Sequence, residues 1–238
     1  ANLYNTFTSY RMFYHCSKLQ YVHTGYVFNS FGVATFESCE SLKTLDYEGC
    51  DESIEGMNFS PNVTIGAFAF LSCPAIEKTR FNHVDIAENP DSGLTNTATT
   101  VDNRAFQHCT GMKTVYFEDG TIGVNAFLDC RNLEEVEILA GTIQNLAFSY
   151  YYVASNNWHN SYSNDYRMNK LSKVILHEGV ESIADYAFEG CTGKLIVNCN
   201  IPSVSSSEHG AFYNSKFTVL IIGNRVTSIG SYAFSGCN

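Results

Sequence analysis

The stretch that decides the fold is V-T-S-I-G-S-Y-A-F-S-G-C, which runs from Val226 to Cys237. It closely repeats V-E-S-I-A-D-Y-A-F-E-G-C, which runs from Val180 to Cys191. Such self-similarity is typical of repeat proteins, in which one unit cannot bury its apolar face alone and its neighbours complete the core. We therefore expect the rest of the chain to consist of further copies of this unit.

The most regular part of the unit is a small residue followed by Phe, two further residues and Cys. The chain holds nine copies, with Met12 and Thr35 in the small position of the first two, and with Tyr151 and Ser215 in the Cys position of the sixth and eighth. Five of the eight steps between successive phenylalanines are 21–24 residues long, and the other three are 34, 36 and 40. The phenylalanines are Phe13, Phe36, Phe70, Phe106, Phe127, Phe148, Phe188, Phe212 and Phe234.

The full unit, I-x3-A-F-x2-C-x2-L-x2-V-x-I, predicts one strand and one turn per coil. The alternation in V-x-I predicts a short strand. The spacings of three and four in I-x3-A-F-x2-C predict a tight bend or a short helical segment. The expected fold is therefore a right-handed α/β solenoid of about eight coils, with parallel strands on one side and turns and short helical segments on the other.

The three longer steps predict loop insertions near residues 48–62, 82–100 and 152–168 in a single domain that covers residues 1–238. They should leave the stack as loops, because the interior of each coil is already filled. The chain ends inside a repeat unit, so we expect it to be part of a longer protein. Two glycosylation sequons, at Asn58 and Asn62, fall in the first insertion.

The phenylalanine-anchored unit V-T-S-I-G-x-x-A-F-x-x-C resembles the BspA-type leucine-rich repeats. The resemblance covers nearly the whole chain, most closely at residues 180–191 and 226–237 and less closely at residues 10–47. It implies a leucine-rich-repeat solenoid without catalytic residues. It also implies the setting of that family: secreted or cell-surface proteins of host-associated anaerobic bacteria and some parasitic protists, linked to adhesion.

Composition and motifs disfavour several functional classes. A formal net charge of −10 argues against nucleic-acid binding, which needs a basic stripe. No apolar run approaches the ~20 residues of a membrane span. Zinc-ligand, G-x-S-x-G and phosphate-cradling motifs are missing from the sequence, so we expect no enzyme activity, cofactor or metal. Seven of the nine cysteines occupy one repeat position, which predicts a buried row of unreactive thiols; Cys50 and Cys199 lie outside it.

Two groups of residues are candidates for contacts with a partner. The third insertion contains the only Trp and a mixture of Tyr, Ser and Asn that is typical of binding loops, although its aromatic side chains could instead pack on the solenoid. Its candidate residues are Tyr152, Trp158, His159, Tyr162 and Tyr166. The second group lies between the buried positions of the predicted strands, on a face that solenoids often use for binding but that could also be merely solvated. It consists of Lys78, Arg80 and Tyr116.

The expected function is non-enzymatic recognition of a protein through the strand face and the aromatic insertion. The partner would be a host extracellular-matrix or surface protein, or a protein of a neighbouring cell, and this chain would be extracellular or on the cell surface. One alternative is a carbohydrate-binding module that stacks Trp158 on a sugar ring. A second alternative is an intracellular interaction scaffold, which would account for nine reduced cysteines and for the lack of a visible secretion signal at Ala1.

Overall fold

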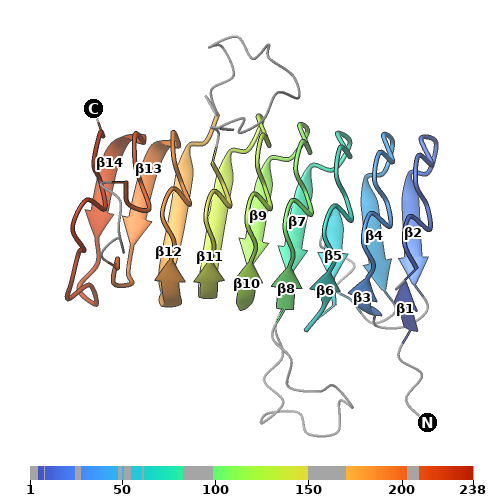
Figure 1. The fold of residues 1–238 in the computed structure, drawn as a ribbon, viewed down its shortest axis with the longest axis horizontal. Helices are drawn as coiled ribbons and strands as arrows, with labels where there is room; N and C mark the ends of the chain where they lie inside the picture. Colours follow the sequence, from blue (N-terminus) through green and yellow to red (C-terminus); the bar gives the residue numbers. More distant parts are fainter. Residues whose placement is uncertain are drawn as a thin grey trace, which may run out of the picture.

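The structure is a computed structural model that describes residues 5–7, 9–24, 28–47, 50, 55–60, 62–82, 99–149, 170–202 and 209–237. Within these ranges it contains strands and turns, stacked along one long axis, and no helix (Figure 1). The strands are β1 (Asn5–Phe7), β2 (Tyr21–Thr24), β3 (Phe28–Phe31), β4 (Thr44–Tyr47), β5 (Met57–Phe59), β6 (Thr64–Ile65), β7 (Lys78–Phe81), β8 (Thr99–Val101), β9 (Thr114–Phe117), β10 (Gly120–Ile122), β11 (Glu135–Ile143), β12 (Lys173–Ile183), β13 (Thr192–Val197) and β14 (Lys216–Ile222).

The strands form one parallel sheet that is arranged in two rows. The front row runs β2-β4-β5-β7-β9-β11-β12-β13-β14, and the second row runs β1-β3-β6-β8-β10-β11-β12. The long strand β11 joins the rows, because residues 135–138 pair with β9 and residues 142–143 pair with β10. The sheet therefore curls around the core, with both rows visible in Figure 1. The solenoid predicted from the repeats is confirmed.

The front row corresponds to the V-x-I strands that the sequence predicts. In β9 and β11, for example, Val115 and Val136 are buried and are paired in register. The second row was not predicted. It comes from the residues that lead into the repeat isoleucine, and it buries the apolar residues Phe31, Ile65, Val101, Ile122, Ile143 and Ile183.

The Ala-Phe-x-x-Cys segment is a turn, so the expectation of short helical segments was wrong for the described coils. The residues before Ala and before Cys have left-handed backbones, such as Arg104 at φ 58° and His108 at φ 62°. A right-handed helix needs negative φ throughout, so these residues prevent one. Hydrogen bonds between coils hold the strained backbone: the Phe106 amide donates to the Ala126 carbonyl at 2.8 Å, and the His108 amide to Leu128 at 2.9 Å.

The repeat phenylalanines form one continuous stack, as the sequence predicts. Neighbouring rings are nearly parallel, with centroids 5.0 Å apart between Phe70 and Phe106 and 5.3 Å apart between Phe106 and Phe127. The stack also continues across the longest step in the sequence, because Phe148 and Phe188 are 5.1 Å apart. Coils that are separated by an insertion are therefore direct neighbours in the core.

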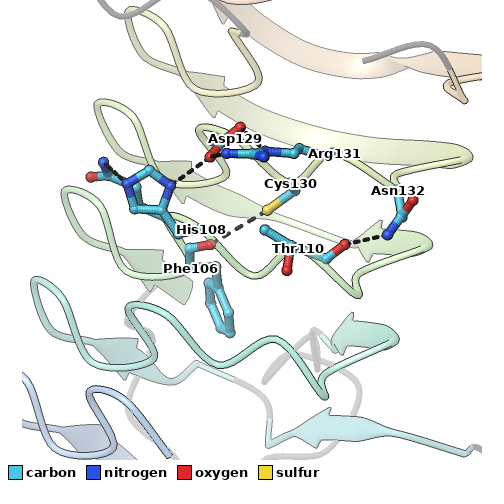
Figure 2. Close-up of polar contacts among 8 residues, drawn as sticks. Phe106, His108, Thr110, Asp129, Cys130, Arg131 and Asn132 are labelled. Atoms are coloured by element: carbon cyan, nitrogen blue, oxygen red, sulfur yellow. Dashed lines mark hydrogen bonds and ion pairs between the residues drawn. The ribbon is translucent and has the colours of Figure 1, made fainter. Parts of the chain in front are cut away.

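Each thiol of the cysteine row after Cys16 lies within hydrogen-bond distance of the phenylalanine carbonyl of the preceding coil. The Cys109 Sγ lies 3.1 Å from the Phe70 oxygen. The Cys130 Sγ lies 3.4 Å from the Phe106 oxygen, a contact that Figure 2 shows. Burial raises the pKa of these thiols, to about 11 at Cys39, so they remain protonated and can donate. The row is buried in its interior, as predicted, whereas at its ends Cys16 is half-buried and Cys237 is exposed.

The first predicted insertion is not a loop throughout. Residues 57–59 form β5, which lies in the front row between β4 and β7 and pairs with both. The second row has no strand at this level, because β3 and β6 pair directly. Strand β5 is thus an additional strand of the front row, and it contributes to the hydrophobic core. Phe59 is buried and stacks on Phe81, with ring centroids 4.9 Å apart. Asn58 and Asn62, the sequon residues, are only 1% and 5% exposed, which disfavours a glycan on the folded chain.

The other two predicted insertions fall largely outside the described residues. In the second, residues 99–100 belong to β8, and residues 83–98 lie outside the described ranges. The third, residues 152–168, lies entirely outside them.

Candidate functional site

The front row brings together two of the three candidate residues that the sequence places on its outer side. Arg80 of β7 and Tyr116 of β9 are direct cross-strand partners, while Lys78 pairs with Thr114 two residues earlier on each strand. The Arg80 guanidinium lies 4.0 Å from the centroid of the Tyr116 ring. This is a cation–π contact between adjacent coils.

Arg80 is held in this position by two further side chains. Its Nε donates to the Asn82 Oδ1 at 2.7 Å, and its Nη2 donates to the Glu118 Oε1 at 3.0 Å. Asn82 is fixed in turn, because its Nδ2 donates to the Asn58 Oδ1 at 2.7 Å. The Arg80 side chain keeps 32% of its surface exposed and Tyr116 is half-buried, so part of this pair remains accessible from solvent.

Cross-strand ion pairs surround the Arg80–Tyr116 pair on the front row. The Lys173 Nζ lies 2.6 Å from the Glu135 Oε1, and the hydrogen bond that Lys173 donates to that carboxylate raises the pKa of Lys173. Exposed pairs of this kind add little to stability. Their effect is to balance charge across the face. The other ion pairs are Lys78–Glu55 and Lys113–Glu77, and the His177 Nε2 lies within hydrogen-bond distance of the Glu137 Oε1.

A second polar cluster lies at the turn edge of the stack, beside the cysteine row (Figure 2). The His108 Nδ1 is 2.7 Å from the Asp129 Oδ2, and Arg131 contacts both oxygens of the same carboxylate at 2.7 and 2.9 Å. Burial raises the pKa of the Asp129 carboxyl, but the hydrogen bonds and charges of His108 and Arg131 outweigh burial and leave it below its ordinary value. Asp129 is therefore an anion that orients the His108 ring.

Beside this cluster the turn edge is hollowed into an open groove with a volume of about 560 Å³. The sequence did not predict this groove, because the residues that flank the cysteines were interpreted as scaffold. A signal was present, since Ser38 and Ser72 occupy the same repeat position before Cys. The groove is lined by Ser38, Glu40, Ser41, Ser72, Pro74, His108 and Thr110.

The aromatic candidates of the third insertion, Tyr152, Trp158, His159, Tyr162 and Tyr166, lie outside the described residues. In the part of the chain that is described, no group of three or more His, Cys, Asp or Glu side chains could hold a metal ion. Nor does that part contain a helix that is long and apolar enough to cross a membrane.

Comparison with known proteins identifies the family. A family model described as "BspA type Leucine rich repeat region" matches six copies, over residues 8–90, 49–154 and 159–238. Among solved structures, a leucine-rich repeat protein from Bacteroides ovatus ATCC 8483 is 16% identical, with a TM-score of 0.37, over 96% of this chain and 67% of that one. A search of curated proteins returns no match. Since the family model spans most of the chain, the protein belongs to the BspA-type leucine-rich repeat family.

Proposed function

We propose that the chain is a non-enzymatic recognition protein that binds another protein through the front row of its sheet. The observation that carries the proposal is the Arg80–Tyr116 pair, in which the guanidinium lies 4.0 Å from the ring centroid on adjacent strands. Arginine and tyrosine are enriched among the residues that dominate protein–protein binding energies. Because Asn82 and Glu118 already hold Arg80, little conformational entropy of the Arg80 side chain is lost when a partner binds.

The surroundings of this pair also suit a protein partner. Paired charges around a central aromatic residue resemble the polar rim of a protein interface. The side chains change in type from strand to strand along the row, from Arg80 through Tyr116 and Glu137 to Ile175. A repetitive polymer would favour a repetitive surface, so this variation favours one specific protein.

The partner we propose is a host extracellular-matrix or surface protein, with this chain outside the cell or on its surface. Support comes from the family and from the presence of an accessible, pre-organised face. The third insertion, with Tyr152, Trp158, His159, Tyr162 and Tyr166, is proposed as an additional contact on its composition. Protease treatment of intact source cells tests the location, since an intracellular scaffold would be protected from cleavage.

The binding proposal is tested with purified extracellular-matrix proteins immobilised on a biosensor. Arg80→Ala and Tyr116→Ala should each weaken the strongest interaction about tenfold or more, as expected for residues at the centre of an interface. Arg225→Ala is the matched control, because Arg225 is 71% exposed in a separate ion pair with Glu178. Equal affinity of the Arg80, Tyr116 and Arg225 variants would exclude the front row as the binding surface.

A further inference from the structure

The turn-edge groove is built from the same repeat positions in three successive coils. Ser38, Ser72 and His108 each precede a cysteine of the row, while Glu40, Pro74 and Thr110 each follow one. These two lines of side chains run along the stack, one residue per coil. Neighbouring coils are ~4.8 Å apart, as in any parallel sheet. The groove therefore offers a regular set of contacts to a linear ligand.

Hydrogen bonds between coils fix the backbone beneath the groove. The Ser38 amide donates to the Leu71 carbonyl at 2.8 Å, and the Ser72 amide donates to the Gln107 carbonyl at 2.9 Å. Both serines have left-handed backbones, with φ of 61° and 58°, which these bonds hold in place. The side chains along this line therefore start from a rigid scaffold.

The His108 end of the groove is also fixed, by side chains of its own coil and of the next one. The Asp129 carboxylate holds the His108 Nδ1 at 2.7 Å, and the Gln107 Nε2 lies 3.0 Å from the His108 Nε2. Beside it, the Asn132 Nδ2 donates to the Thr110 carbonyl at 2.6 Å (Figure 2). The imidazole plane is thus set before any ligand arrives.

The groove differs from the front row in the state of its polar groups. On the front row the charged side chains are largely paired with one another. In the groove, by contrast, the hydroxyls of Ser38, Ser41, Ser72 and Thr110 and the carboxylate of Glu40 have no hydrogen-bond partner within the described ranges of the chain. These hydroxyls and the carboxylate remain available to a ligand.

The chemistry of these groups points to a neutral, hydroxyl-rich ligand. Serine and threonine hydroxyls both donate and accept, and an ionised carboxylate accepts two hydrogen bonds. The lining contains no Lys or Arg that would attract an anion, and no Tyr or Trp that would anchor a peptide. Pro74 and the fixed His108 ring supply small flat surfaces for the carbon face of a sugar. We infer that this groove binds a linear, uncharged oligosaccharide.

The test uses the whole chain and three neutral tetrasaccharides: β-1,4-linked glucose, α-1,4-linked glucose and β-1,4-linked N-acetylglucosamine. Calorimetry should detect binding of at least one of them. Glu40→Gln should weaken that binding tenfold or more, because the carboxylate loses its charge, and Thr110→Val should weaken it several-fold. The matched control is Glu181→Gln, which removes an exposed carboxylate on β12, away from the groove. Circular dichroism verifies that each variant is folded.

Several results would overturn the inference. One is that none of the three tetrasaccharides binds at millimolar concentration. Another is that binding survives Glu40→Gln and Thr110→Val unchanged but is abolished by Trp158→Ala, which would place the sugar on the third insertion instead. Tighter binding of a sulfated or uronic-acid oligosaccharide, or of an acidic peptide, would also contradict a neutral ligand. Loss of matrix-protein binding in the Arg80 variant alone would leave the inference intact.

Discussion

Glu189 is a buried carboxyl that should make the stability of the solenoid depend on pH. It is 6% exposed, and its one described hydrogen bond comes from the Ser149 hydroxyl at 3.3 Å. Burial raises its pKa from 4.5 to about 7, and this hydrogen bond lowers it only in part. Between these two pH values, Glu189 is therefore protonated in the folded state but ionised in the unfolded state.

The size and sign of the effect follow from linkage. A rise from 4.5 to about 7 corresponds to ~3 kcal/mol at about 1.4 kcal/mol per pH unit. Because the folded pKa is the higher one, the folded state is favoured below pH 4.5, and that advantage is lost as the pH rises to 7. Glu189→Gln removes the ionisable group. We expect it to stabilise the chain by up to ~3 kcal/mol at pH 8 and to have little effect at pH 4.

Urea unfolding of the wild type and of Glu189→Gln from pH 4 to pH 8 measures this difference. Other carboxyls titrate in both proteins, so their contributions cancel in the comparison. Glu181→Gln provides the control, since it removes the same charge from an exposed position on β12. A difference between wild type and Glu189→Gln that does not change with pH would refute the assignment of a raised pKa to Glu189.

Three further predictions concern the stack and the front row. Phe106→Ala should lower the free energy of unfolding, measured with urea, by about 3–5 kcal/mol, because the ring is fully buried between Phe70 and Phe127. Phe106→Leu should lower it clearly less, and equal losses for the two variants would argue against ring stacking. A maleimide should rapidly label Cys16, Cys50 and Cys237 in the folded chain and leave Cys39, Cys73, Cys109, Cys130, Cys191 and Cys199 unmodified; fast labelling of the latter would contradict their burial. A double-mutant cycle with Arg80→Ala and Tyr116→Leu should give a coupling of roughly 0.5–1 kcal/mol, and zero coupling would show that the cation–π contact contributes nothing.

The features that the sequence predicted correctly are those marked by residue identity at a fixed spacing. The Ala-Phe-x-x-Cys anchor recurs in register, so the phenylalanine stack and the cysteine row could be derived from it. The front strands could also be predicted, because Val136 and Ile138 alternate with polar residues over the length of a strand. The outward positions of Lys78, Arg80 and Tyr116 followed from the same alternation.

The features that the sequence did not reveal depend on very short elements or on contacts between coils. Strand β6 is two residues long, and β5 is three, so neither shows enough alternation to be recognised. The turn has helix-like spacing but left-handed residues, such as Arg104 and His108, and non-glycine residues give little sign of that conformation. The Arg80–Tyr116 contact and the turn-edge groove depend on which residues the register of neighbouring coils places side by side.

Site-specific photocrosslinking on intact source cells tests most directly whether the front row is the binding surface. A benzophenone amino acid replaces Tyr116 on the front row or Glu181, which is exposed in the part of β12 that pairs with the second-row end of β11. The account predicts that position 116 crosslinks to one discrete extracellular protein and that position 181 does not. Crosslinks of equal strength at both positions, or at position 181 alone, would contradict recognition through the front row.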